Sequence, residues 1–204
     1  YLPIDPRMGR MVLEAKRQDC LSEVLILAAA LAIQDPRERP MERAQAADQR
    51  HAEFRDERSD FVGLLKLWQF YDAMLKHKKS NRKLAQELRE NFLSPMRMRE
   101  WREVHGQLHV LLAETGAGFN ATEASYERVH RALLSGLLGN IGSKNEEGDY
   151  DGARGIRFAM HPSSGLRKRQ PRWILAAELV ETARLYARVT AQVEPVWIEQ
   201  AAYH

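Results

Sequence analysis

Residues 183–191 have the sequence ARLYARVTA, in which apolar and polar side chains alternate. Successive side chains of a β-strand point to opposite faces, so this stretch predicts a strand with one buried and one solvent-facing side. The buried side would comprise Leu185, Ala187, Val189 and Ala191, and the other side Arg184, Tyr186, Arg188 and Thr190. A strand with cationic and aromatic side chains on its open face is a candidate binding surface.

Strand patterns surround this stretch. Ile156, Phe158 and Met160 alternate with Arg157 and Ala159, and residues 173–180 form a second apolar run. Glycines punctuate the polar residues 139–155, and Pro195 is suited to start a short closing helix. About 65 residues with several short strands favour a small barrel of the OB or SH3 type.

The preceding residues have the apolar spacing of helices. Asp5-Pro6 and Ser94-Pro95 each place a capping side chain before a proline, which is typical of a helix start. Helices are expected over about 6–17, 21–33, 60–75 (ending at the Lys76–Lys79 run), 84–92, 95–112 and from Thr122 or Ser125 to 137. Residues 41–58 suit an exposed helix or a loop. The predicted fold class is mainly α with a C-terminal β-barrel.

Composition limits the classes of protein. The chain has 204 residues and a net charge of +3, but residues 1–60 have a net charge of −2 and residues 150–191 a net charge of +5. Cys20 is the single cysteine, which excludes an internal disulfide and favours a cytoplasmic setting. No apolar run is long enough for a membrane span, so no membrane partner is expected. The first residue is Tyr1 rather than Met, so we expect a fragment or processed chain.

Motifs for catalysis are missing from this sequence. There is no Gly-x-x-x-x-Gly-Lys-Ser/Thr phosphate loop, no Gly-x-Ser-x-Gly elbow and no His-Glu-x-x-His. His105 and His109 are four residues apart but lack a third ligand at a supporting spacing, so no metal is expected. The acidic cluster Asp48, Glu53, Asp56, Glu57 and Asp60 lacks calcium-loop spacing and is interpreted as a solvated helix face.

The remaining candidate is the basic and aromatic face of the β-rich region. Single-stranded nucleic acid requires cations along its phosphates and flat side chains on which bases stack. The candidate nucleic-acid-binding residues are Arg154, Arg157, Lys168, Arg184, Tyr186 and Arg188. Charge alone leaves two other interpretations open, a protein-docking face and a merely solubilising surface. The tryptophans Trp68, Trp101, Trp173 and Trp197 lie on apolar faces and are expected in cores.

Several segments together resemble the C-terminal part of DEAH-box RNA helicases, most closely the bacterial HrpA type. The resemblance rests on matches in the family's order along nearly the whole chain. They are LPIDPR (2–7), the helix of residues 20–33, QDPRERP (34–40), SDF (59–61) with Leu64, Leu65 and Trp68, NFLS (91–94), MREW (98–101), ALLSGLL (132–138), HPSS (161–164), Trp173, ELVET (178–182) and Pro195-x-Trp197.

The resemblance implies the end of a winged helix and a helical-bundle (ratchet) domain in residues 1–131, and an OB-fold in residues 132–204. It also implies that these domains grip single-stranded RNA beside two RecA-like motor domains of the same polypeptide, which bind ATP and magnesium and hydrolyse ATP. The present chain lacks those motors, so we expect it to hold no cofactor, to be monomeric and not to be an enzyme alone. The alternative function is a protein-interaction module that docks a partner or the helicase core without touching RNA.

Overall fold

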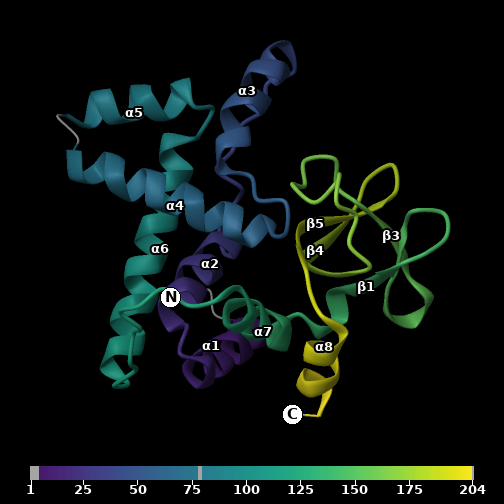
Figure 1. Cartoon of the computed structure of the whole chain (residues 1–204). Helices are drawn as coiled ribbons and strands as arrows, with labels where there is room; N and C mark the ends of the chain where they lie inside the picture. Colours follow the sequence, from purple (N-terminus) through teal and green to yellow (C-terminus); the bar gives the residue numbers. More distant parts are fainter. Residues whose placement is uncertain (1–4, 78–79, 204) are drawn as a thin grey trace. The chain divides into compact units, whose positions relative to one another are not determined.

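The structure is a computed structural model that describes residues 5–77 and 80–203 (Figure 1). Residues 2–4 of the LPIDPR match and Lys78-Lys79 of the lysine run lie outside the described residues. The α-helices are α1 (Pro6–Gln18), α2 (Leu21–Leu31), α3 (Ala44–His51), α4 (Asp60–His77), α5 (Asn81–Glu90), α6 (Pro95–Glu114), α7 (Tyr126–Gly136) and α8 (Pro195–Ala202). The 3-10 turns are η1 (Met41–Arg43), η2 (Ala52–Phe54), η3 (Leu138–Asn140) and η4 (Ala153–Gly155). The strands are β1 (Ile141–Lys144), β2 (Tyr150–Asp151), β3 (Arg157–Met160), β4 (Trp173–Glu181) and β5 (Leu185–Gln192).

Short polar side chains start the helices where the sequence predicted starts. The Asp5 carboxylate accepts a hydrogen bond from the Met8 amide, and Ser94 does the same for the Arg97 amide, each with proline at the next position. Ser125, rather than Thr122, caps α7 through the Arg128 amide. These caps satisfy amide groups that the first turn of a helix leaves without a partner.

The described residues form two compact units. The helical unit combines residues 25–55 and 63–117, and the barrel unit combines residues 5–24, 56–62 and 118–203. Each unit is therefore built from segments that are distant in the sequence. The expected domain boundary between residues 131 and 132 stays a prediction.

Trp101 lies at the centre of the helical unit. Its side chain is fully buried, its indole nitrogen donates to the Ile26 carbonyl at 2.9 Å, and its ring meets that of Trp68 at 5.1 Å between centroids. Residues 36–38 run antiparallel beside residues 92–94 through two backbone hydrogen bonds of 2.8 Å. The core role predicted for these two tryptophans is confirmed.

The strands of the barrel unit close on themselves in the order β1-β2-β3-β5-β4. The pairing between β3 and β5 is parallel, whereas the other neighbouring strands pair antiparallel. The barrel core comprises Tyr150, Phe158, Leu166, Ile174, Ala176 and Ala187. Gly142 is required in β1 because a Cβ at this position would overlap the Phe158 ring. The predicted fold class, helices followed by a C-terminal β-barrel, is confirmed.

Two details differ from the sequence prediction. Strands β1 and β2 lie in residues 139–155, for which no strand was predicted. The alternation of β5 holds through Arg188 but stops at Val189, which has a left-handed φ of 56°. Beyond it Thr190 is fully buried rather than solvent-facing. The basic and aromatic face is therefore shorter than the sequence pattern indicates.

Candidate nucleic-acid interface

A pocket of about 260 Å³ opens on the barrel beside the start of β5. Two of the predicted residues, Arg184 and Tyr186, line it together with Arg167 from the turn between β3 and β4. The remaining lining residues are Gly148, Asp149, Tyr150, Ala159, Met160, Pro162 and Gln170. Tyr186 reaches this place because β5 pairs in parallel with β3, which sets Tyr186 opposite Ala159. The pocket thus combines two arginines and an aromatic ring.

Arg184 is held by an ion pair across the pocket. Its Nη2 atom lies 2.6 Å from Oδ2 of Asp149, and the arginine side chain is about half exposed. Asp149 is itself positioned by Asn145, whose side-chain oxygen accepts a hydrogen bond from the Asp149 amide at 3.0 Å. A guanidinium has five N–H donors in a rigid fork, so this contact orients the group while leaving donors for a phosphate.

Tyr186 meets a second ring at the edge of the pocket. The centroids of Tyr186 and His161 lie 5.7 Å apart, with the rings nearly perpendicular. His161 is fixed in turn, because its Nδ1 atom accepts a hydrogen bond from the Ser163 amide at 3.1 Å. A partly exposed tyrosine held by an edge-on neighbour is a suitable platform for a base. Charge and alternation in the sequence did not point to His161.

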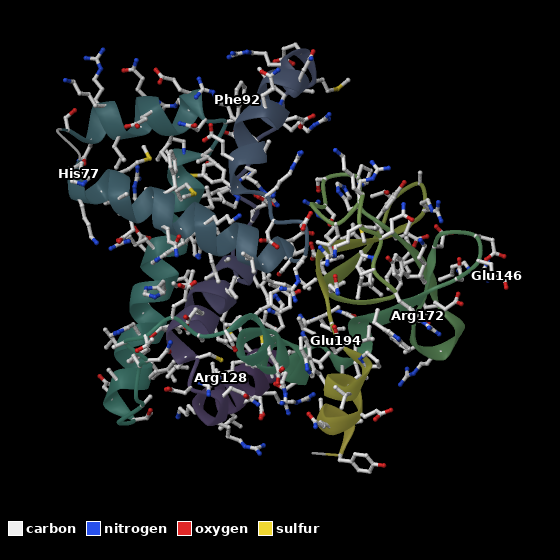
Figure 2. All side chains as sticks on the ribbon, in the orientation of Figure 1. His77, Phe92, Arg128, Glu146, Arg172 and Glu194 are labelled. Carbon is white, nitrogen blue, oxygen red and sulfur yellow. The ribbon has the colours of Figure 1, made fainter. Side chains whose placement is uncertain are left out.

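In the part of the chain that the structure describes, the other four predicted residues are not among those that line this pocket. Arg157 pairs with Asp151 of the neighbouring strand at 3.4 Å. Arg154 has a left-handed φ of 58° in η4, and Lys168 is exposed in the turn before β4. Arg188 lies opposite Glu178 in the β4–β5 ladder. The six residues therefore lie on the barrel, but only Arg184 and Tyr186 converge at one place. Figure 2 draws the side chains of the barrel together with those of the other described residues.

Asp60, the first residue of α4, fixes the far end of β5. Its Oδ1 atom accepts a hydrogen bond from the Gly165 amide at 2.9 Å, and its Oδ2 atom accepts from the Thr190 amide at 2.9 Å. The hydroxyls of Ser164 and Thr190 also donate to Oδ2, at 2.8 and 3.2 Å. The interpretation of the acidic cluster as a solvated helix face is wrong for Asp60, whose carboxylate joins two segments of the barrel unit.

The residues just before Asp60 lie alongside β5. The Gln192 amide donates to the Arg58 carbonyl at 2.8 Å, and Ser59 bridges to Ala191. Gly165 is required in the facing turn because a Cβ there would overlap the Asp56 carbonyl. Residues 56–60 therefore act as an additional edge of the barrel, although they come more than 80 residues before its first strand.

A buried chain of hydrogen bonds ties this segment to α7. His130 is fully buried, and its Nδ1 atom lies 2.7 Å from the Tyr126 carbonyl, which can only accept. Nδ1 therefore carries the proton, and Nε2 accepts from the Ser59 hydroxyl at 2.6 Å. Burial lowers the pKa of His130 to about 4. This serine–histidine pair is inaccessible to a substrate and has a structural role.

No metal site is found within residues 5–77 and 80–203, where no cluster of three or more histidine, cysteine or acidic side chains could hold an ion. The rings of His105 and His109 lie 6.1 Å apart. Burial, with the charges of His109 and Arg102, lowers the pKa of His105 to about 4. In the same part of the chain, no helix is both long and apolar enough to cross a membrane.

The described residues thus combine α-helices with a closed five-stranded barrel, on which two arginines and a tyrosine line one pocket. Residues 129–204 match the family described as the oligonucleotide/oligosaccharide-binding (OB)-fold. Residues 5–65 match the helicase associated domain (HA2), described as ratchet-like. The chain therefore carries the helicase associated and OB-fold domains of the C-terminal region of DEAH-box RNA helicases.

Individual relatives agree with this assignment. The chain is 45% identical over its whole length to the ATP-dependent RNA helicase HrpA of Escherichia coli, and 44% identical to the HrpA homolog of Haemophilus influenzae. It is also 29% identical over 99% of its length to the probable ATP-dependent RNA helicase DHX35 of Homo sapiens. The chain spans 16% of the length of each bacterial relative and 28% of the human one.

Proposed function

We propose that this chain is the strand-gripping accessory region of an ATP-dependent RNA helicase. The proposal rests on the convergence of Arg184, Arg167 and Tyr186 on one pocket of the barrel. In this proposal the two guanidinium groups contact successive phosphates and the Tyr186 ring stacks on a base. The exposed Arg154, Arg157 and Lys168 and the partly buried Arg188 extend the cationic track to either side.

The energy for movement comes, in the same proposal, from RecA-like motor domains of the same polypeptide. Those domains bind ATP and magnesium, and the region described by the structure holds the RNA strand between successive rounds of ATP hydrolysis. The chain acts as part of a monomeric, cytoplasmic protein. The match of the helicase associated domain and the names of the relatives support this assignment of roles.

Binding of a labelled single-stranded RNA to the 204-residue chain, followed by fluorescence anisotropy, tests the proposal. Tyr186→Leu removes the stacking platform and should weaken binding by about 1–3 kcal/mol. Arg184→Gln removes one phosphate contact, which should weaken binding uniformly across sequences and reduce the slope of log K against log salt by about 0.7. Measurements at about 50 and about 200 mM salt give that slope.

Arg50→Gln is the matched control, because Arg50 is an exposed arginine of α3 in the helical unit. It should leave affinity and salt slope close to those of the unsubstituted chain. Equal affinities for the Tyr186→Leu, Arg184→Gln and control variants would place any RNA contact elsewhere on the chain.

A further inference from the structure

A second and larger pocket, which we call the basic groove, lies in the barrel unit between α1, α7 and α8. Its volume is about 530 Å³, roughly twice that of the pocket beside β5. The three helices are labelled in Figure 1. The lining residues are Arg10, Leu13, Glu14, Arg17, Gln18, Arg131, Ser135, Leu138, Trp197, Gln200 and Ala201. None of the predicted RNA-contacting residues is among those named.

Apolar side chains form the floor of the basic groove. Leu13 of α1 is 64% exposed and Leu138 of η3 is 37% exposed, and the buried Trp197 and partly buried Ala201 of α8 complete the floor. Covering such an exposed leucine side chain with another apolar surface is favourable, because it removes apolar area from water. An apolar patch bordered by charged residues is typical of a site for another polypeptide.

The border of the basic groove is cationic. Arg10, Arg17 and Arg131 line it, whereas Glu14 is the one acidic residue among those named, which gives the lining a net charge of +2. Arg17 pairs with Glu14 at 3.2 Å, and Arg131 pairs with Glu127, outside the lining, at 3.3 Å. No ion pair is found for Arg10 within the described ranges 5–77 and 80–203. With Glu127 counted, the border still has an excess of one positive charge, at Arg10, which is complementary to a carboxylate.

We propose that the basic groove binds an acidic, amphipathic helical segment of a partner protein. Leucine or phenylalanine side chains of that segment cover Leu13 and Leu138, and its flanking carboxylates pair with Arg10 and Arg131. A helix presents such anchors at intervals of three and four residues, which suits a groove bordered by helices. Single-stranded RNA fits this site poorly, because a base needs an exposed ring and Trp197 is only 8% exposed.

Three synthetic peptides of about 16 residues, about the length of an ordinary helix, test the proposal by fluorescence anisotropy. The first has leucines at helical spacing and glutamates between them. The second replaces the glutamates with lysines, and the third replaces the leucines with serines. The first should bind the 204-residue chain more tightly than either of the others, because it alone satisfies both the floor and the border of the groove.

Substitutions then locate the binding. Leu13→Asp and Arg10→Glu should each weaken binding of the first peptide at least about tenfold, whereas Val110→Asp should not change it. Val110 is the matched control, because it is an apolar residue of α6 with 59% exposure and lies outside the groove. Thermal unfolding of each variant confirms that it remains folded.

The proposal is overturned if the three peptides bind alike, if none binds, or if Leu13→Asp binds the first peptide as the control does. It is also overturned if a single-stranded oligouridylate binds the chain and Leu13→Asp or Arg10→Glu abolishes that binding, because the groove would then be an RNA site. A loss of RNA binding in Tyr186→Leu alone leaves the peptide result unaffected, so the two proposals fail independently.

Discussion

Asp60→Ala should destabilise the barrel unit strongly, because the carboxylate holds two segments of this unit together. The carboxylate accepts two backbone N–H groups, from Gly165 and Thr190, and two hydroxyls, from Ser164 and Thr190. One of the hydroxyls can still donate to the other, because their oxygen atoms lie 2.9 Å apart. The two amides have no such alternative.

The magnitude follows from those two amides. An unsatisfied buried donor costs about 1–3 kcal/mol. The loss of both carboxylate oxygens leaves two such amides and should lower the free energy of unfolding by about 2–4 kcal/mol. The upper limit is below twice the single cost because water can reach this partly exposed position. Asp60→Asn keeps one oxygen but turns an NH₂ group toward a donor, which should cost about half as much. Either loss is large against the total of about 5–15 kcal/mol that is usual for a domain.

Urea unfolding followed by circular dichroism measures the free energy, and hydrogen exchange of the Thr190 and Gly165 amides shows whether the change is local. Glu57→Gln is the control, because Glu57 belongs to the same acidic cluster but is 76% exposed in its ion pair with Arg169. It should shift the free energy of unfolding by less than about 0.5 kcal/mol. If Asp60→Ala unfolds at the same urea concentration as Glu57→Gln and the two amides stay protected, Asp60 does not hold the barrel as described.

Two further predictions concern the core of the barrel unit. Burial lowers the pKa of His130 to about 4, so the unfolded chain, with a histidine pKa near 6.5, binds the proton first. Stability should be constant above about pH 7 and fall by up to about 3 kcal/mol toward pH 4, and equal urea midpoints at about pH 7.5 and about pH 5 would contradict this. Gly142→Ala should cost about 1–3 kcal/mol by forcing the Phe158 ring to move, whereas Gly139→Ala, with open space around it, should cost much less. Similar thermal unfolding midpoints for the two alanine variants would refute the overlap.

The helices could be predicted from the sequence because their signals are local. Asp5 and Ser94 each precede a proline, and the cap and the apolar spacing lie within a few residues of each other. Strands β1 and β2 lack such signals. Strand β1 contains Gly142 and is only four residues long, and its pairing is set by β4, more than 30 residues further along the chain. Local patterns cannot reveal a partner at that distance.

The candidate site, too, could be predicted from the sequence only in part. Alternation along one strand was sufficient to select Arg184 and Tyr186. Arg167 and His161 join them only through the closure of the turn after β3 and the parallel pairing of β3 with β5. Asp60 was assigned to solvent because its acceptor role depends on Ser164 and Thr190, which follow it by 104 and 130 residues. Contacts of this kind are invisible to charge patterns.

Because residues 56–60 lie beside β5, the barrel is not a self-contained segment of the chain. A protein trimmed to residues 129–204 would contain every strand, but the Thr190 and Gly165 amides would lose their acceptor and His130 its serine. It would also lose α1, whose Met11 packs closely against Gly136 of α7. A transfer of this barrel into another protein therefore requires residues 56–60 and α1 to be transferred with it.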